Sequence, residues 1–162
     1  MTAELSEAGL VRLSFNSYNA RNQQPPQTSD SSASPLPIVP MLIERLQAYV
    51  SGQRVNFDDI PLDSDGLTAF RRAVTESCRR VAYGEVISYQ ELARRAGHPD
   101  AARAVGQVMA NNRWPIIVPC HRIIASGGRL GGYSAPDGLA LKKRLLALEQ
   151  GAAVSFAYRP EV

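Results

Sequence analysis

The sequence predicts an α+β fold, in which a small N-terminal β-containing domain packs on a mostly helical C-terminal domain. Three observations lead to this prediction. Apolar and polar residues alternate near the N-terminus, as in a half-buried strand. Apolar residues recur at helical spacing later in the chain. The 162 residues, 44% of them hydrophobic, suffice for one well-cored domain with a small appendage. We expect an α/β-type domain over residues 1–65, a second domain over 66–150 and a tail over 151–162.

The N-terminal domain is expected to hold one strand, one helix and two irregular segments. The apolar/polar alternation covers residues 9–15 and predicts the strand. Residues 17–37 are rich in Asn, Gln, Ser and Pro, which is typical of a flexible surface segment. Apolar residues at helical spacing predict a helix over residues 41–50. The acidic residues 56–65, which include a proline, predict an extended connection to the second domain.

Two amphipathic helices are expected to frame the C-terminal domain. Residues 66–81 place Phe70, Val74 and Cys78 on one helical stripe, so we interpret Cys78 as a small core residue. Residues 138–150 form a closing helix with an apolar face and a basic face. We expect the apolar face to contain Leu141, Leu145 and Leu148, and the outward face to contain Lys142, Lys143 and Arg144.

A helix-turn-helix is predicted between these two helices. Residues 88–91, Ser-Tyr-Gln-Glu, form a capping box that starts a short helix ending at Ala96. Residues 97–100 form a turn that begins with glycine, and a second helix follows over 101–111 with Asp100 as its N-cap. Two short helices joined in this way are typical of DNA-binding proteins, although the motif is common.

The second helix of this pair is unusual because it contains many small residues. Helices that read bases in the major groove present several long polar side chains, whereas this one has a single arginine, Arg103. Small residues suit either close packing against another helix or an approach to the minor groove. From the residues alone both interpretations remain open. The small residues are Ala101, Ala102, Ala104, Gly106 and Ala110.

The composition narrows the class of protein. The sequence has no apolar run near the roughly 20 residues that a membrane helix needs, and no signal peptide is visible at its start. Two cysteines cannot form a disulfide framework, which favours a reducing cytoplasm. Two Cys and two His without a Cys-x-x-Cys pair also argue against structural zinc, so no metal site is predicted.

The charge is unevenly distributed along the chain. The net charge of +3 combines residues 1–65, with 4 basic and 8 acidic side chains, and residues 66–150, with 13 basic and 6 acidic side chains. The second segment therefore carries a net charge of +7 beside an acidic segment of −4. A basic segment of this kind hints at a polyanionic partner such as nucleic acid, although basic faces are often simply solvated.

A tetrad of residues 119–122, Pro-Cys-His-Arg, follows the apolar run Ile-Ile-Val. Cysteine chemistry needs the thiolate, which a neighbouring base favours. Adjacency in sequence does not ensure contact, and a free cysteine is more often a buried hydrophobe. Cys120 does not lie on a helical apolar stripe, however, so it is the candidate nucleophile and His121 the candidate base.

Together these motifs resemble the O6-alkylguanine-DNA alkyltransferase family. The resemblance covers about residues 66–150, and its order and spacing are specific. It is carried by Tyr83-Gly84-Glu85, Ser88-Tyr89, Arg103-Ala104-Val105-Gly106, Asn112, Pro119-Cys120-His121-Arg122, Gly132-Tyr133-Ser134 and Leu145-Leu146-Ala147-Leu148-Glu149. Residues 1–65 match the family only loosely, and because the predicted strand lies so near the start, a shortened N-terminal sheet is expected.

The resemblance implies a chemistry for the tetrad. Cys120 would attack the alkyl carbon on O6 of guanine and keep the alkyl group as a thioether, so that each molecule acts once and no cofactor is needed. His121 would deprotonate Cys120 through a water molecule, and Glu149 would orient His121. Asn112 would act as the hinge between the helix-turn-helix and the active-site loop.

The resemblance also implies double-stranded DNA containing O6-alkylguanine as the partner of a monomer, with cooperative assembly on DNA left open. Arg103 would enter the base stack where the target base has departed, and Ala102 and Gly106 would form the minor-groove surface. Tyr89 would lie at the rotating phosphate and donate toward N3 of the base. The base pocket would comprise the Ser134 N–H, the carbonyls of Cys120 and Ile123, and the side chains of Met109, Pro115 and Tyr133.

Two other functions remain as alternatives. A lesion sensor similar to the alkyltransferase-like proteins would bind the damage without repairing it, but those proteins have Trp where this chain has Cys120. A helix-turn-helix regulator with a redox-active thiol would use the basic helix pair instead. The presence of a single long charged side chain, Arg103, on the predicted recognition helix counts against the regulator.

Overall fold

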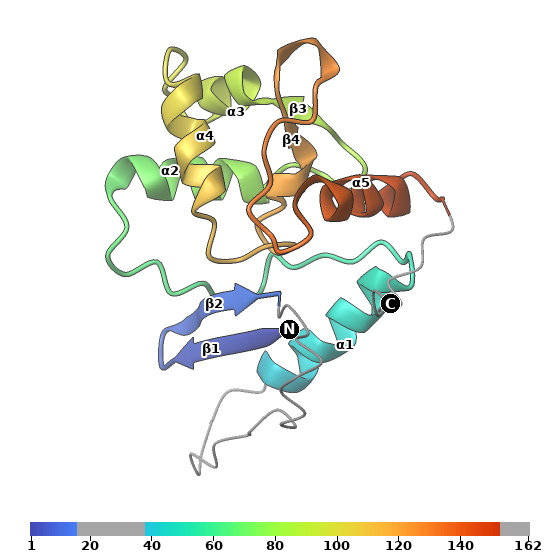
Figure 1. Cartoon of the computed structure of the whole chain (residues 1–162). Coiled ribbons are helices and arrows are strands. Elements are labelled where there is room, and N and C mark those ends of the chain that lie inside the picture. Colours follow the sequence, from blue (N-terminus) through green and yellow to red (C-terminus); the bar gives the residue numbers. More distant parts are fainter. Residues whose placement is uncertain (16–37, 153–162) are drawn as a thin grey trace.

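The computed structural model describes residues 1–15 and 38–152, and within them it shows the expected α+β fold. A β-hairpin and helix α1 lie at one end of the molecule, and helices α3 and α4 lie at the other (Figure 1). The elements are β1 (Thr2–Ser6), β2 (Gly9–Ser14), α1 (Ile38–Val50), α2 (Ala69–Arg79), β3 (Ile87–Ser88), α3 (Tyr89–Arg95), α4 (Ala102–Ala110), β4 (Ile123–Ile124) and α5 (Gly138–Glu149), with two 3₁₀ turns, η1 (Cys120–Arg122) and η2 (Ser126–Gly128).

The N-terminal sheet is a two-stranded antiparallel hairpin. The predicted strand is present as β2, but the sequence prediction missed β1, which pairs with it from Thr2 opposite Ser14. Gly9 sits at the start of β2 with φ of +138°, and a Cβ there would lie 2.4 Å from the carbonyl oxygen of Pro61. This close approach lets the N–H of Leu10 donate to the same carbonyl at 2.9 Å. The hairpin is therefore bonded to the connection that leads into the second domain.

Helix α1 begins at Ile38, three residues before the predicted start, and ends at Val50 as predicted. Its buried face carries Ile38, Leu42 and Tyr49. The predicted flexible segment, residues 17–37, lies outside the described residues, as does most of the predicted C-terminal tail. Residues 56–65 form turns with an isolated bridge to β2 rather than a helix or a paired strand, consistent with the predicted connection.

The closing helix α5 corrects one prediction about its basic residues. Lys142 does not face outward: it is fully buried, while Leu141 and Leu145 on the same helix are buried as expected. Its ammonium Nζ donates to the carbonyl oxygen of Ile123 at 2.6 Å and to that of Leu130 at 2.5 Å. These two carbonyls replace the hydration that the charge would otherwise have in water, which allows a lysine to be buried here.

The predicted helix-turn-helix is present as α3 and α4 (Figure 1). Ser88 Oγ accepts from the Glu91 N–H at 3.0 Å, so half of the capping box forms. The Glu91 carboxylate pairs with Arg94 and Arg95 instead of closing the box. Because Arg94 and Arg95 lie one turn further along the same helix, they are within reach of a flexible glutamate.

The N-cap predicted for the second helix is wrong. Helix α4 begins at Ala102 and its N-cap is Ala101, which makes no side-chain capping bond, so Asp100 does not cap it. The reason is the turn before the helix, in which the Ala101 N–H donates to the His98 carbonyl at 3.0 Å. Because of that turn, Asp100 lies one residue before the N-cap position, where its side chain does not cap the free N–H groups of the first helical turn.

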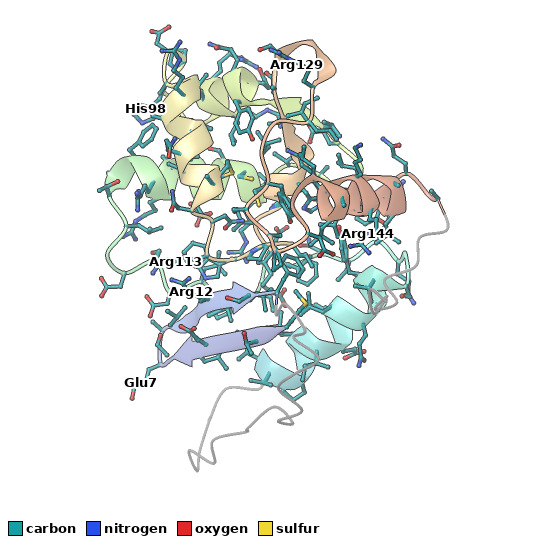
Figure 2. All side chains as sticks on the ribbon, in the orientation of Figure 1. Glu7, Arg12, His98, Arg113, Arg129 and Arg144 are labelled. Atoms are coloured by element: carbon teal, nitrogen blue, oxygen red, sulfur yellow. The ribbon has the colours of Figure 1, made fainter. Side chains whose placement is uncertain are left out.

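The core joins the N-terminal elements to the helices around the loop that precedes Cys120. One cluster of buried side chains contains Leu10 and Tyr49 as well as Val74 and Trp114. Trp114 Nε1 donates to the Leu10 carbonyl at 2.7 Å, which ties the hairpin to this loop. Arg113, labelled in Figure 2, lies where the loop after α4 meets the hairpin, and its carbonyl accepts from β2. In the described part of the chain, no helix has the length and apolar character needed to cross a membrane.

Candidate active site

The loop from Trp114 to Cys120 presents the candidate nucleophile. Ile116, Ile117 and Val118 are buried, as the apolar run predicts. The Val118 N–H donates to the Trp114 carbonyl at 2.8 Å, and the Cys120 N–H donates to the Val118 carbonyl at 2.8 Å. Ile116 has φ of +74°, which is strained for a β-branched residue and persists because surrounding packing holds it. The loop is therefore a tightly folded support rather than a loose connection.

Asn112 connects the end of the helix-turn-helix to the Cys120 sulfur. Its Nδ2 lies 2.8 Å from the Val118 carbonyl oxygen and 3.1 Å from Cys120 Sγ, and its Oδ1 accepts from the Trp114 N–H at 3.0 Å. Burial raises the pKa of the Cys120 thiol, and the hydrogen bond from Asn112 opposes that shift. The amide thus bonds both ends of the loop and donates to the atom that carries the negative charge in the thiolate.

His121 is fully buried beside Cys120 and is bonded to Glu149. The distance from His121 Nε2 to Glu149 Oε1 is 2.8 Å. Burial lowers the pKa of His121, although the bond to Glu149 opposes this, so the imidazole is neutral near pH 7. An ionised carboxylate only accepts hydrogen bonds, so Nε2 carries the proton and Nδ1 carries the free lone pair. Nδ1 is buried and has no hydrogen-bond partner among the described residues.

Glu149 is held by a second set of donors that the sequence did not reveal. Arg122, the last residue of the tetrad, donates to Oε1 from Nη2 at 2.8 Å and to Oε2 from Nε at 2.9 Å. The N–H of Gly84 donates to Oε2 at 3.0 Å. Burial alone would raise the pKa of Glu149, but the bonds from His121 and Arg122 hold it well below its usual range. The carboxylate therefore stays ionised and fixed.

Lys142 is a buried positive charge that interacts with Cys120. Burial lowers its pKa to about 8, and the negative charge of an ionised Cys120 opposes that shift. The same interaction lowers the pKa of Cys120. Because Lys142 Nζ is anchored on the Ile123 carbonyl, three residues past Cys120, its charge is fixed relative to the sulfur. The sequence prediction missed this residue by assigning it to the solvent face.

The short parallel pair of β3 and β4 brings Tyr89 to the same region. Ile87 of β3 pairs with Ile123 of β4. Tyr89 comes directly after β3, and the turn that contains Cys120 comes directly before β4, so the strand pair brings the two close together. Tyr89 is half-buried, and its ring lies so close to Gly131 that a Cβ there would be 3.2 Å from it. Gly131 also has φ of +68°, so both the backbone and the space favour glycine.

The residues predicted to line a base pocket are spread around this centre. The Tyr133 hydroxyl is buried, and burial together with the charge of an ionised Cys120 raises the pKa of Tyr133. Ser134 is exposed, Pro115 is half-buried and Met109 is buried. The Ile123 carbonyl already accepts from Lys142, but a carbonyl oxygen has two lone pairs and can accept a second bond.

The outer face of α4 carries the small residues. Val105, Val108 and Met109 supply the packing side of the helix, whereas Arg103 is exposed and Ala102 is half-buried. A Cβ added at Gly106 would meet nothing within 4 Å. Gly106 is therefore not used for close packing inside the molecule, which favours the second interpretation, a surface for an outside partner.

Two cavities lie elsewhere on the molecule. One of about 200 Å³ opens between α2 and the end of α4, and one of about 440 Å³ opens beside Tyr83 and Arg122. Neither is lined by Cys120, Tyr89 or Tyr133. Within the described residues no cluster of three or more His, Cys, Asp or Glu side chains could hold a metal ion.

A family model and two similar relatives of this chain point to the same protein family. Residues 69–151 match the family described as 6-O-methylguanine DNA methyltransferase, DNA binding domain. The chain is 45% identical over 108 residues to the methylated-DNA–protein-cysteine methyltransferase of Mycolicibacterium paratuberculosis, covering 67% of this chain and 63% of that protein. It is 45% identical over 107 residues to the protein of the same name from Methanosarcina acetivorans, covering 65% of each. The aligned part thus spans slightly less than two thirds of these relatives.

Solved structures confirm the α+β fold. The chain resembles Mycobacterium tuberculosis OGT, solved in complex with DNA, with a TM-score of 0.71 and 34% identity over 94% of this chain and 88% of that one. It resembles O6-methylguanine-DNA methyltransferase from Pyrococcus kodakaraensis with a TM-score of 0.56 and 34% identity over 66% and 61% of the two chains. The M. tuberculosis match extends over the N-terminal elements as well as the helices.

Proposed function

The chain belongs to the 6-O-methylguanine DNA methyltransferase family, and we propose that it repairs DNA by moving the alkyl group of O6-alkylguanine onto Cys120. The observation that carries this proposal is the series formed by the half-buried Asn112 and the buried Cys120, His121 and Glu149. It supplies a donor to the sulfur, a neutral imidazole with a free Nδ1, and a fixed carboxylate behind that imidazole. Nucleophile, base and orienting group are the three parts that activated-nucleophile catalysis requires.

The proposed reaction is a single displacement at the alkyl carbon. His121 Nδ1 takes the thiol proton through a water molecule, and Cys120 Sγ attacks the carbon attached to O6 of guanine. A carbon–sulfur bond forms, the carbon–oxygen bond breaks, and its electron pair moves into the guanine ring. The Tyr89 hydroxyl donates toward N3 as that charge develops, and the proton that His121 took from the thiol is passed on through water, so that the base becomes neutral guanine. Restored guanine leaves, and the stable thioether prevents a second turnover.

DNA would approach the end of the molecule formed by α3 and α4. The base must leave the duplex before the thiolate can reach it. The small residues on the outer face of α4, with the half-buried Ala102 and Gly106 among them, suit the minor groove, and Arg103 would fill the gap in the stack. The net charge of +7 on residues 66–150 supports contact with phosphates. A cytoplasmic location with access to the chromosome belongs to the same proposal.

The flipped base would occupy the space between Cys120 and the residues after η2. The Ser134 N–H would face O6, and the Cys120 and Ile123 carbonyls would accept from the exocyclic amine. Tyr133, together with Met109 and Pro115, would form the walls. The polar groups would then read the guanine edge, while the alkyl group points at the sulfur.

Mass spectrometry after mixing the protein with a duplex that contains one O6-methylguanine tests the proposal. We expect a stoichiometric gain of one methyl group, mapped by peptide analysis to Cys120. Cys78, which is fully buried on α2, should remain unmodified and serves as an internal control. Cys120→Ala should bind the duplex and gain nothing. Tight binding of the lesion without any modification of Cys120 would reject repair and support a lesion sensor.

Arg103→Ala is expected to slow transfer from a duplex about tenfold, because filling the vacated stack offsets part of a flipping cost of a few kcal/mol. Single-turnover rates on duplex and single-stranded substrates measure this effect. Transfer from the single strand, where no base has to leave a pair, should be nearly unchanged. Arg129→Ala removes another exposed arginine at the same end of the molecule and is the matched control (Figure 2). Equal duplex rates for Arg103→Ala and wild type would reject the assignment of Arg103.

A further inference from the structure

Tyr49, from the N-terminal part of the chain, contacts both His121 and Glu149. It lies in the last turn of α1 and is fully buried. Its hydroxyl donates to Glu149 Oε1 at 2.6 Å and lies 3.2 Å from His121 Nε2. Its ring meets the His121 ring edge-on, with centroids 6.5 Å apart. Tyr49 lies outside the matched residues 69–151, and it precedes His121 by 72 positions.

The Tyr49 hydroxyl can donate only one hydrogen bond, which limits how it can interact with Glu149 and His121. A tyrosine hydroxyl has one proton to give, and here it goes to the ionised carboxylate. Its oxygen lone pair then faces the proton on His121 Nε2, which is already shared with Glu149 Oε1. Burial and the charge of Glu149 raise the pKa of Tyr49, so the hydroxyl keeps its proton over the whole working pH range. Tyr49 is thus a permanent neutral donor to the carboxylate.

Tyr49, His121 and Arg122 all bond Glu149 Oε1, and this sharing affects the protonation of the His121 imidazole. Each donor to a carboxylate oxygen disperses its negative charge and weakens the other bonds to that oxygen. A weaker bond from Glu149 stabilises the charged form of His121 less. Arg122 acts in the same direction, through its bonds to Glu149 and through its own positive charge.

We propose that Tyr49 is a positioning residue for His121: its hydroxyl shares the Glu149 carboxylate with the imidazole and thereby keeps His121 neutral, with Nδ1 as the unprotonated nitrogen. This inference rests on the proposed function, because a neutral His121 is what accepts the thiol proton. It also makes α1 part of the site, although the family match begins only at residue 69. The ionisable groups that interact with His121 are Tyr49, Arg122, Lys142 and Glu149, and Cys120 precedes it in the chain.

Tyr49→Phe tests the proposal because it removes the hydroxyl and keeps the ring packing. Nuclear magnetic resonance of the imidazole nitrogens follows the titration directly. The chain has only two histidines, and His98 is exposed and provides an internal reference. We expect the pKa of His121 to rise by about half a unit to one unit in the variant, as expected for loss of one competing hydrogen bond. An unchanged titration of His121 would overturn the proposal.

The rate of alkyl transfer should follow the same shift. His121 must be neutral to act as a base, so the acidic limb of the pH–rate profile lies where the imidazole becomes protonated. In Tyr49→Phe this limb should move to higher pH by the same amount, and the rate on the limb should fall about three- to tenfold. The DNA concentration that gives half-maximal rate should not change, since α1, which carries Tyr49, and α4 lie at different ends of the molecule (Figure 1). A uniform loss of rate at all pH values, without a shifted limb, would mean a purely structural role and would also overturn the proposal.

Tyr83→Phe is the matched control. Tyr83 packs edge-on against Tyr49. Its hydroxyl donates to the Gly52 carbonyl at 3.5 Å rather than to His121 or Glu149. This variant should keep the wild-type limb and the wild-type His121 titration. If wild-type protein transferred no methyl group, the proposed function would fail on its own, while the magnetic resonance titration of Tyr49→Phe would still decide the role of Tyr49.

Discussion

Arg122→Met is expected to lower the free energy of unfolding by about 3–5 kcal/mol, because it breaks a buried ion pair from one side. Arg122 is 7% exposed, and it bonds both oxygens of Glu149 and the Val81 carbonyl, the latter at 2.6 Å. Methionine fills similar space but donates nothing. The Glu149 carboxylate would keep its charge in a buried site with fewer donors, and the Val81 carbonyl would lose its partner.

Urea unfolding at pH 7 measures this loss, and its pH dependence identifies the group responsible. The pKa of Glu149 is held below its ordinary value in the folded protein. Its contribution is therefore fully present above the unfolded pKa of 4.5 and is lost as pH falls toward the folded value. The difference in stability between wild type and Arg122→Met should shrink below about pH 4.5, since protonation removes the charge that the variant leaves uncompensated.

Two further variants separate this ion pair from general effects of removing an arginine. Arg144→Met removes the partly exposed partner of Asp137 and should cost less than about 1 kcal/mol. Adding Glu149→Gln to Arg122→Met removes the unpaired charge and should restore part of the stability. A small loss in Arg122→Met, equal to that in Arg144→Met, would show that the buried pair does not contribute as described.

The features that sequence predicts well are those set by neighbours along the chain. Helical periodicity located α2 and α5, and the Ser88–Glu91 spacing located the start of α3, because capping involves residues three apart. The tetrad likewise made Cys120 and His121 the candidate nucleophile and base. The site geometry then places Asn112 and Glu149 against them, at positions that only the family pattern had singled out.

The features that sequence missed are set by contacts distant along the chain. Tyr49 looked like an ordinary apolar-face residue of α1, and nothing near it in sequence indicates a carboxylate 100 positions later. The sequence analysis gave Arg122 no role, and its bonds to Glu149 and Val81 become visible only in the folded chain. The strand β1 escaped because Thr-Ala-Glu-Leu-Ser has no strong strand preference, and pairing with β2 decides its structure.

Lys142 differs most from its sequence prediction, because it was expected in solvent and is fully buried. Its substitution is the second change for which we expect a large effect. Lys142→Met should lower the single-turnover rate of alkyl transfer at pH 7 by about ten- to a hundredfold, because loss of a buried charge raises the pKa of Cys120 by about one to two units. The cation and the thiolate favour each other in the folded protein. Lys143→Met, which removes the exposed neighbouring cation, should leave the rate unchanged.

The pH dependence distinguishes a fixed charge from a packing role. The folded pKa of Lys142 is about 8, below its ordinary value of 10.5. Above pH 8 the folded protein loses the ammonium proton that the unfolded chain still holds, so stability should rise with pH between about 8 and 10.5 in wild type relative to Lys142→Met. Over the same range the rate advantage of wild type should decline, because the charge that favours the thiolate is being removed. A rate ratio that stays constant through pH 8 would contradict the electrostatic role and leave only the two carbonyl bonds as the function of this lysine.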